Sequence, residues 1–515
     1  MGDMIVVQDL VKNYGEFCAV NHISFTVPEG KIFGFLGPNG AGKTTTIKML
    51  TTVLDPTSGF IRVNGYDPTR EQKQVRRSFG IVFQDPSLDY ELTAYENMDL
   101  HGVLYGVPRG ERHKRIDMLV DFVGLGERKN DLVKTYSGGM KRRLEVARAA
   151  ARAADSVSRR ANHRTRPADA QPHLGIHLAA EQRRGSDRFL HDALYGRGRP
   201  RGWRGGRDRS RKNRGAGFAR GAERAHEVRE SRRRVHRADR ARDPRGRGER
   251  CGSHENDGTR VARRRAAMKA IYILCLRQLK RYVRSPARII GSLGQPILFL
   301  VALGFGLRTM FARAGQGNYI NFLSPGIVSM AILFNAVFSG IEIIWDRQFG
   351  FLKETLVAPV SRMEIVLGRM LGGAIVAFVQ GIIVLVICLI AGFRIQSSPY
   401  VWLTVVFMFL ISLLFAGIGT VFGSVLQDMQ GFPLIINFII MPIFFFSGAL
   451  FAANGLPKVL QVMLRLNPLS YGVDGLRGAC SSVFAFGLTT DLAVSVVLTA
   501  LLLAIGSYFF SKIQL

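Results

Sequence analysis

Cysteine is scarce in this sequence: five are present in 515 residues, at Cys18, Cys251, Cys275, Cys388 and Cys480. No two of them have the short spacing of a metal site or of a disulfide framework. That scarcity excludes a small secreted domain held together by disulfides. We therefore expect the parts of the chain outside a membrane to be cytosolic and reduced.

Acidic residues are also few, with 39 Asp and Glu against 70 Lys and Arg, which gives a formal net charge of +31. Much of the excess lies in residues 151–267, where 32 Arg and one Lys outnumber 14 acidic residues. Only 11 of these 117 residues are Leu, Ile, Val or Phe. Because a segment with so few apolar residues cannot bury a core, we expect residues 151–267 to be disordered.

A phosphate-binding loop lies close to the start of the chain. Apolar or alternating runs at residues 5–7 and 23–27 predict strands, the run 31–36 (KIFGFL) predicts a buried strand, and residues 45–54 predict a helix. Before that helix stands the pattern G-x-x-x-x-G-K-[ST], formed by Gly37, Pro38, Asn39, Gly40, Ala41, Gly42, Lys43 and Thr44. In such a loop backbone N–H groups surround phosphates, the lysine reaches the outer phosphates, and the threonine binds Mg²⁺. An ordinary glycine-rich turn is the alternative, and the strand–loop–helix setting disfavours it.

Three further motifs accompany this loop in a fixed order. Tyr14 precedes it, Gln84 follows an apolar run, and Ser137-Gly138-Gly139 stand directly before a predicted helix. Each would mean little alone. Together with the loop they make residues 1–150 resemble the nucleotide-binding domain of ABC transporters, and residues 92–97 (LTAYEN) resemble its drug- and lipid-exporting members.

The resemblance implies ATP and Mg²⁺ as cofactors. It assigns the adenine to Tyr14, the metal to Thr44 and Gln84, and the phosphates to the loop together with Thr45. The signature residues Ser137, Gly138 and Gly139 would close on the ATP of an opposite subunit.

The second half of that domain does not follow. After Arg148 the family pattern requires a strand ending in an Asp that holds Mg²⁺ and a Glu that polarises water, then a switch histidine. None of these is present in the sequence. The histidines of the next segment stand among arginines and are interpreted as incidental: His163, His173, His177 and His191. No catalytic residue is therefore assigned.

A shifted reading frame explains the gap. If each codon from about Ala151 is read one base later, residues 151–155 can encode HEPRI and residues 156–163 can encode LFLDEPTI. Residues 164–172 can then encode GLDPQTRNR, and residues 191–201 a string like TTHYMEEADRV. These strings contain the missing motifs in order. We therefore predict that residues from about 150 to 267 are an out-of-frame translation that runs into a neighbouring reading frame at Met268.

The alternative for this segment is a genuine nucleic-acid-binding linker. Arginine runs such as 232–234 and 263–265 would attract phosphate. Aromatic residues are sparse there, however, and charge alone supplies only non-specific attraction. Nucleic acid is therefore the less favoured partner.

A membrane domain is predicted after Met268. A helix needs roughly 20 apolar residues to cross a bilayer, and six such runs are present, at 289–307, 325–344, 367–392, 401–425, 432–453 and 489–511. No signal peptide is expected, since Asp3 and Asp9 interrupt the apolar start, so the membrane helices would serve for targeting. A basic amphipathic stretch before the first run is placed at the cytoplasmic surface, with Arg277, Lys280, Arg281, Arg284 and Arg288.

That orientation also decides where the other charged residues lie. It puts four further basic residues on the cytoplasmic side: Arg347, Lys353, Arg362 and Lys512. Lys458, Arg465 and Arg477 fall outside, in a long loop where the charge rule weakens. Glu342, near the end of the second run, is expected to snorkel or to pair with Arg347, although a place in a substrate path is open.

Residues 268–515 resemble the ABC-2 type membrane subunits of drug, polysaccharide and O-antigen exporters. The resemblance lies in residues 347–354 (RQFGFLKE), 358–362 (APVSR) and 467–471 (NPLSY). In that family the first of these stretches couples to the ATPase near its glutamine loop. The alternatives without a coupling role are a solvated charged loop for residues 346–362 and a helix-ending turn for residues 467–471.

The whole chain thus predicts a truncated α/β P-loop ATPase half-domain (1–150), an Arg-rich disordered segment (151–267) and an all-α membrane domain with six transmembrane helices (268–515). The resemblances imply an exporter of a drug, lipid or glycan in the plasma or inner membrane, acting as a homodimer or with a separate ATPase or permease partner. ATP hydrolysis is expected to be lost. A permease module attached to a non-functional ATPase fragment is the alternative.

Overall fold

The computed structural model describes residues 3–31, 33–83, 85–161, 257–307, 319–396, 399–426, 428–451 and 457–513. The predictions for Gln84 and for most of the Arg-rich segment therefore lie outside the described residues. The described parts of residues 1–182 and 263–515 belong to one compact unit.

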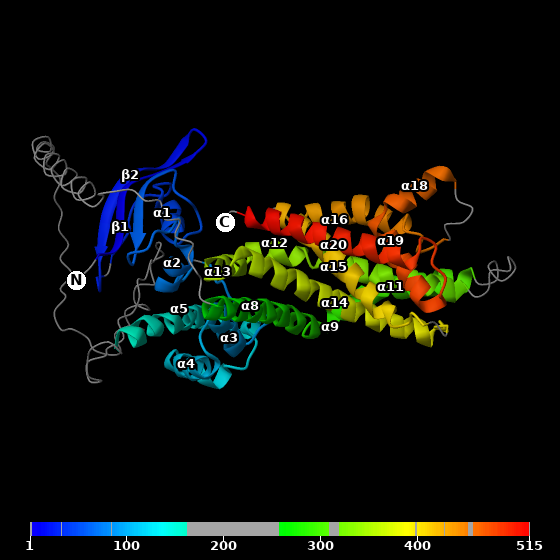
Figure 1. Cartoon of the computed structure of the whole chain (residues 1–515). Coiled ribbons are helices and arrows are strands. Elements are labelled where there is room, and N and C mark those ends of the chain that lie inside the picture. Colours follow the sequence, from blue (N-terminus) through cyan, green and yellow to red (C-terminus); the bar gives the residue numbers. More distant parts are fainter. Residues whose placement is uncertain are drawn as a thin grey trace, which may run out of the picture. The chain divides into compact units, whose positions relative to one another are not determined.

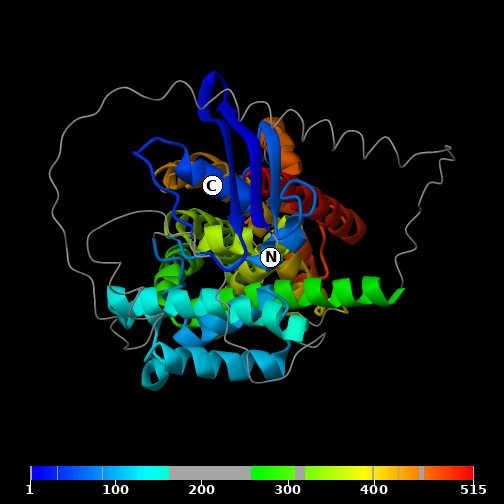
Figure 2. The ribbon, with the colours of Figure 1, turned by 90° about the vertical axis from the view of Figure 1, so that its left-hand side faces the viewer.

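The N-terminal part is built on a three-stranded antiparallel sheet in the order β2-β1-β3 (Figures 1 and 2). Its strands are β1 (Asp3–Tyr14), β2 (Phe17–Pro28) and β3 (Ser58–Val63). A tight turn at Gly15 joins the first two, and the predicted strands at 5–7 and 23–27 are confirmed. Apolar side chains of the sheet bury against α1 (Lys43–Leu50), including Met49 and Leu50.

The strand expected at residues 31–36 is wrong. Among the described residues 31 and 33–36 the chain has no strand pairing, and neither has it at 79–83 after α2 (Gln72–Ser78). A buried strand needs a neighbour for its backbone N–H and C=O groups. Residues 33–36 and 79–83 find no such neighbour among the described residues.

A helical subdomain follows in the N-terminal part. It consists of α3 (Ala94–Leu104), α4 (Arg109–Phe122), the short helices η1 (Gly126–Arg128) and η2 (Val133–Thr135), and α5 (Gly138–Ala161). A capping box fixes the start of α3, because Thr93 accepts from the Glu96 N–H while the Glu96 carboxylate accepts from the Thr93 N–H. Leu88, Met98 and Leu144 share its core.

The C-terminal half is helical. Its elements, seen in Figure 1, are α8 (Asp257–Val283), α9 (Pro286–Gly306), α11 (Tyr319–Phe338), α12 (Ile341–Gln348), α13 (Phe351–Val357), α14 (Arg362–Ile390), α15 (Leu403–Val425), α16 (Gly431–Ile435), η3 (Ile436–Ile440), α17 (Met441–Phe445), α18 (Lys458–Leu466), α19 (Pro468–Ser481) and α20 (Leu488–Ser511).

Five stretches of the described residues, not six, are long and apolar enough to cross a membrane: Pro286–Gly306, Tyr319–Gln348, Arg362–Ile390, Leu403–Val425 and Leu488–Ser511. The run predicted at 432–453 forms only a shorter apolar helix, Gly431–Phe445. A π-helical turn interrupts it and Phe446 ends it, so the apolar composition of the run overstated its helical length.

Small residues bring the membrane helices close together. A Cβ atom on Gly340 would lie 2.0 Å from the Gly419 carbonyl oxygen of α15, and one on Gly419 would lie 2.6 Å from the Val337 carbonyl oxygen of α11. Such contacts let helix backbones pack tightly where lipid offers no hydrophobic driving force. Large rings such as Phe407 and Phe415 fill the rest of this core.

Candidate nucleotide site and its contact with the membrane helices

The phosphate-binding loop is a compact turn that leads into α1. Gly40 and Gly42 have φ angles of +85° and +78°, a region that favours glycine. The Lys43 ammonium group folds back and donates to the carbonyl oxygens of Gly37 (2.5 Å) and Pro38 (2.8 Å). The helix itself begins at Lys43. The loop therefore brings together the lysine and the helix N-terminus that a phosphate requires.

The neighbouring positions fit a nucleotide with Mg²⁺. Thr44 is exposed in the first turn of α1, next to Thr45, so its hydroxyl is available to a metal ion. Gly42 lies against β2, where a Cβ atom would meet the Ala19 carbonyl oxygen at 2.4 Å. Only glycine fits there, which explains the residue type at this place in the motif.

Tyr14 and the signature residues lie at the surface. The Tyr14 side chain at the end of β1 is 46% exposed, with the Lys12 ammonium 5.4 Å from its ring centroid. Ser137 precedes α5 and its hydroxyl accepts from the Met140 N–H at 3.3 Å, while Gly138 and Gly139 are exposed. The signature is thus open to another molecule, as the resemblance implies.

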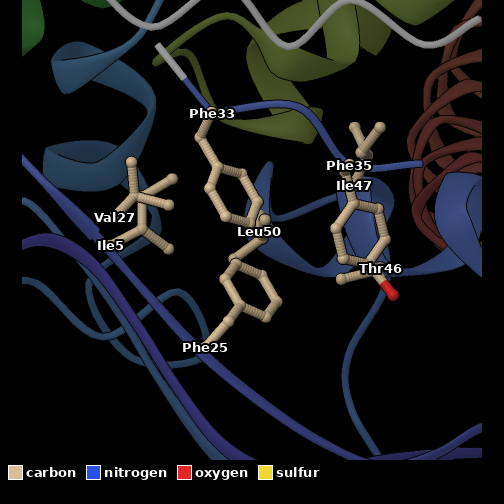
Figure 3. Close-up of a pocket in the computed structure, with 8 residues that line it drawn as sticks. All are labelled: Ile5, Phe25, Val27, Phe33, Phe35, Thr46, Ile47 and Leu50. Carbon is tan, nitrogen blue, oxygen red and sulfur yellow. The ribbon is translucent and has the colours of Figure 1, made fainter. Parts of the chain in front are cut away.

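An apolar hollow lies beside this loop, between the sheet and α1 (Figure 3). The rings of Phe33 and Phe35 each lie 5.4 Å from the ring of Phe25, centroid to centroid. The one hydroxyl that lines the hollow, from Thr46, donates to the Gly42 carbonyl. A triphosphate could not bind in such a lining. The hollow instead marks where two phenylalanines of the expected strand pack without a strand partner.

A buried polar cluster joins the loop after Gln84 to α5. The fully buried Glu145 carboxylate accepts from the Ser87 N–H at 2.6 Å and from its hydroxyl at 3.2 Å. Burial raises the pKa of Glu145, against the smaller opposing effects of Arg148 and Ser87. Arg148 donates to the Ser87 carbonyl at 3.1 Å. No sequence pattern predicts this cluster, since Ser87 and Glu145 are 58 residues apart and follow no motif.

Helix α13 contacts this cluster from the C-terminal half. Its buried Glu354 pairs with Arg148 at 3.3 Å and with His101 of α3 at 2.9 Å. Gly350, which begins α13, lies beside Pro86 and Ser87. At the other end of the helix Val357 joins the apolar core of the N-terminal sheet. The stretch 347–354 thus contacts residues that directly follow Gln84, as its family resemblance implies.

Helix α8 makes a second contact with the N-terminal part. The buried Arg277 bridges Asp89 at 2.5 Å and Asp346 of α12 at 2.8 Å. Burial alone would lower the pKa of Arg277, but Asp346 and Asp89 together raise it above its usual range. Part of the predicted basic stretch thus faces acidic groups rather than solvent.

Glu96 of α3 completes this contact. It pairs with Lys280 at 2.9 Å and with Arg284 at 2.6 Å. Burial raises its pKa, but hydrogen bonds from Arg284, the Thr93 N–H and Lys280 outweigh that effect and lower the pKa of Glu96 to about 2.

Two predictions about charged residues in the membrane half are wrong. Glu342 pairs with Arg288 at 2.5 Å, whereas Arg347 donates to the carbonyl oxygens of Ser424 and Leu426. Glu342 and Arg347 are five residues apart on α12, whereas side chains that meet on one helix face are three or four apart. Arg477 does not lie in a loop but is half-buried within α19, and Lys458 and Arg465 lie on α18.

Comparison with known proteins agrees with this arrangement. Residues 20–157 match the family model described as ABC transporter, and residues 269–481 match the one described as ABC-2 type transporter. Both halves of this chain thus match families of ABC transporters. Its membrane half makes the chain a multi-pass membrane protein.

Curated relatives match the ATP-binding half. The linearmycin resistance ATP-binding protein LnrL of Bacillus subtilis (strain 168) is 42% identical over 28% of this chain and 47% of its own length. The daunorubicin/doxorubicin resistance ATP-binding protein DrrA of Streptomyces peucetius is 46% identical over 28% of this chain and 43% of its own length. The chain thus spans about half the length of the curated relatives it matches.

Among solved structures, an ATP-binding subunit of an ABC transporter is 30% identical over 29% of this chain and 62% of its own. Its TM-score of 0.28 is too low to establish a common fold.

Proposed function

We propose that this chain derives from an ABC exporter and joins its ATP-binding half to its ABC-2 permease. The observation that carries the proposal is the buried contact of Glu354 with Arg148 and His101, together with the place of α13 beside Pro86. This contact lies just after Gln84, the expected Mg²⁺ ligand. A movement caused by nucleotide binding would therefore pass to the membrane helices there. The permease works across the plasma or inner membrane, with the ATP-binding half on the cytoplasmic side.

ATP and Mg²⁺ bind at residues 37–45, with Thr44 and Gln84 at the metal and Tyr14 at the adenine. Two chains, or this chain and a separate partner, enclose ATP between one phosphate-binding loop and the signature 137–139 of the other. Differential binding of ATP to the closed pair would then shift the membrane helices. The cargo is a drug, lipid or glycan, by analogy with the antibiotic resistance proteins that the ATP-binding half resembles.

Hydrolysis is lost in this chain. The carboxylates that would hold Mg²⁺ and polarise water are not in the sequence after Arg148. Residues 33–36 and 79–83 form no strand, so the phosphate-binding loop does not follow a strand of a central sheet. This supports a second cause for the loss of hydrolysis, namely that the loop is held less firmly.

The segment between the halves is an out-of-frame translation. The ABC transporter match ends at residue 157 and the ABC-2 match begins at residue 269, so neither family model includes the Arg-rich residues between them. Sequencing the gene across the codons for Arg148 to Ser156 tests this directly. A base gained or lost there restores the catalytic strand and makes the chain two proteins, whereas an unchanged reading establishes a true fusion.

A permease module with a non-functional ATPase fragment is the second candidate, favoured by the unpaired segments beside the phosphate-binding loop. The two candidates differ in nucleotide binding. The exporter-derived chain binds a fluorescent ATP analogue, and Lys43→Ala abolishes that binding. If the wild-type chain binds no better than Lys43→Ala, but an intact ATPase added in trans restores transport, the permease-only candidate is correct.

A further inference from the structure

Two carboxyl groups from neighbouring helices meet inside the membrane half. Asp474 lies in α19 and Asp491 in the first turn of α20, and the two residues are 5% and 0% exposed. Asp474 is bonded to the backbone of the turn just before α20, and Asp491 lies in the first turn of that helix, so the two buried carboxyl groups act on each other. This pair belongs to none of the motifs that indicate an ABC transporter.

Hydrogen bonding distinguishes the two side chains. One oxygen of Asp474 accepts from the backbone N–H groups of Ala485 (2.8 Å) and Phe486 (2.9 Å), which fixes it against the turn between α19 and α20. Both oxygens of Asp491 are buried, and no N–H or O–H group of the described residues donates to either. The Asp474 carboxyl beside it can supply a hydrogen bond only if one of the two groups carries a proton.

No cation among the described residues forms an ion pair with the carboxyl pair. Arg477, one turn along α19, acts on Asp474 through space, but its guanidinium donates to the carbonyls of Phe322 (3.4 Å) and Gly448 (3.0 Å). The Tyr319 hydroxyl of α11 donates to the Leu450 carbonyl at 3.0 Å.

The remaining polar neighbours do not supply a counter-charge either. α15 and α17 contribute no ionisable side chain. The other ionisable residues of the elements around this end of α20 are Cys388 on α14, Tyr471 and Cys480 on α19, Arg394 and Tyr400 between α14 and α15, and Lys458 and Arg465 on α18. Of these, Arg394, Tyr400, Lys458 and Arg465 are exposed.

Two ionised carboxylates at this separation would repel each other strongly in a medium of low dielectric constant. The N-terminus of α20 offers a partial positive charge, which favours one negative charge beside it but not two. One proton between the two oxygens removes the repulsion and supplies the missing hydrogen bond, as in other buried carboxyl pairs.

We propose that Asp474 and Asp491 form a proton-binding site that joins α19 to α20. A bound proton holds the two helices together through the shared hydrogen bond. Its release leaves two carboxylates that push the helices apart. The proposed ligand is a proton, and no group of three His, Cys, Asp or Glu side chains that could hold a metal ion is found among the described residues.

The site lies at the end of α20 away from the ATP-binding half. The other end of that helix places Phe510 in one apolar cluster with Leu92 and Leu100. About 20 residues of helix, roughly 30 Å at 1.5 Å per residue, separate the two ends. If the proposed cytoplasmic place of the ATP-binding half is right, the protons come from the outer side; the site itself does not depend on that proposal.

Infrared spectroscopy of the purified full-length chain in detergent tests the site. The carbonyl stretch of a protonated carboxyl group should be present near neutral pH and should vanish as the pH is raised. Asp491→Asn should remove this band. Asp428→Asn, which changes an exposed carboxyl group, should leave it unchanged.

A second measurement does not require the variant to fold. The wild-type chain should unfold at a lower temperature as the pH rises through the titration of the band, because the folded pair holds a proton that separate aspartates in the unfolded chain release. A band that is absent at neutral pH, or that persists in Asp491→Asn, overturns the proposal. So does a band lost on replacing choline by sodium at constant pH, since sodium would then be the ligand.

Discussion

At the scale of single residues, the contact between the two halves depends on a few buried ion pairs. Glu354 is the clearest example, since it pairs with two basic residues of the ATP-binding half. Because the desolvation of buried charges offsets much of their attraction, such pairs add specificity more surely than stability. Removing one partner is nevertheless costly, because a charge then remains buried with fewer partners.

Glu354→Gln should therefore weaken the contact. Arg148 keeps Glu145 at 3.9 Å as a second carboxylate, so we expect a loss of about 1.5–3 kcal/mol, the usual worth of a hydrogen bond to a charged group. Thermal unfolding in detergent measures it. The matched control is Lys353→Gln on the same helix, whose side chain makes no ion pair among the described residues; its effect should stay within about 0.5 kcal/mol. Equal losses in both variants would refute the role of Glu354.

Glu96 gives a prediction about pH. Its pKa is lowered to about 2 in the folded chain, so its pairing with Lys280 and Arg284 stabilises the fold above the ordinary pKa of a glutamate. That contribution is lost as the pH falls from about 5 towards 2, where the folded chain must also take up the proton. Because Glu96 is partly exposed, we expect about 1 kcal/mol.

The measurement is the unfolding temperature of the wild-type chain and of Glu96→Gln across that pH range. The difference between them should be present at neutral pH and should shrink as the solution becomes acidic. A difference that is constant with pH would show that Glu96 acts by packing rather than by charge.

At the scale of elements, close helix packing positions the membrane core. Gly419→Ala would put a Cβ atom 2.6 Å from the Val337 carbonyl oxygen, which the α11 backbone cannot avoid without moving. We expect a loss of about 1–3 kcal/mol, typical of overpacking. Gly291→Ala in α9 is the control, because a Cβ atom there meets nothing within 4 Å. Equal unfolding temperatures for the two variants would contradict the tight packing of α15.

Local sequence patterns predicted the elements that depend on neighbours in the sequence. The phosphate-binding loop, α1 and the long apolar spans follow from spacing and composition alone. The strand at 31–36 was wrong because strand formation depends on a distant partner, and that partner is missing. The span at 432–453 was too long because apolar composition does not reveal the π-helical turn at 436–440.

The partners of charged side chains could not be predicted from the sequence either. Glu342 has an arginine five residues away at Arg347, yet it pairs with Arg288 from another helix. The Glu145–Ser87 cluster and the Asp474–Asp491 pair likewise join residues without a motif. Only the packing of helices brings them together.

At the scale of the whole molecule, the chain joins a part that matches ABC transporters to a part that matches ABC-2 type transporters. Two halves that contact each other through α8 and α13 can still respond to nucleotide, because the loop at 37–45 and the contact at Glu354 are both present. ATP binding should therefore persist although ATP hydrolysis is lost. A chain of this kind should bind ATP but not consume it.

The most direct test is ATP turnover by the purified full-length chain, compared with Lys43→Ala prepared in the same way. We predict that neither protein hydrolyses ATP above the background of the preparation, and that vanadate changes neither rate. Vanadate-sensitive turnover by the wild-type chain that Lys43→Ala abolishes would contradict the account. Some carboxylate outside the expected motif would then have to act in catalysis.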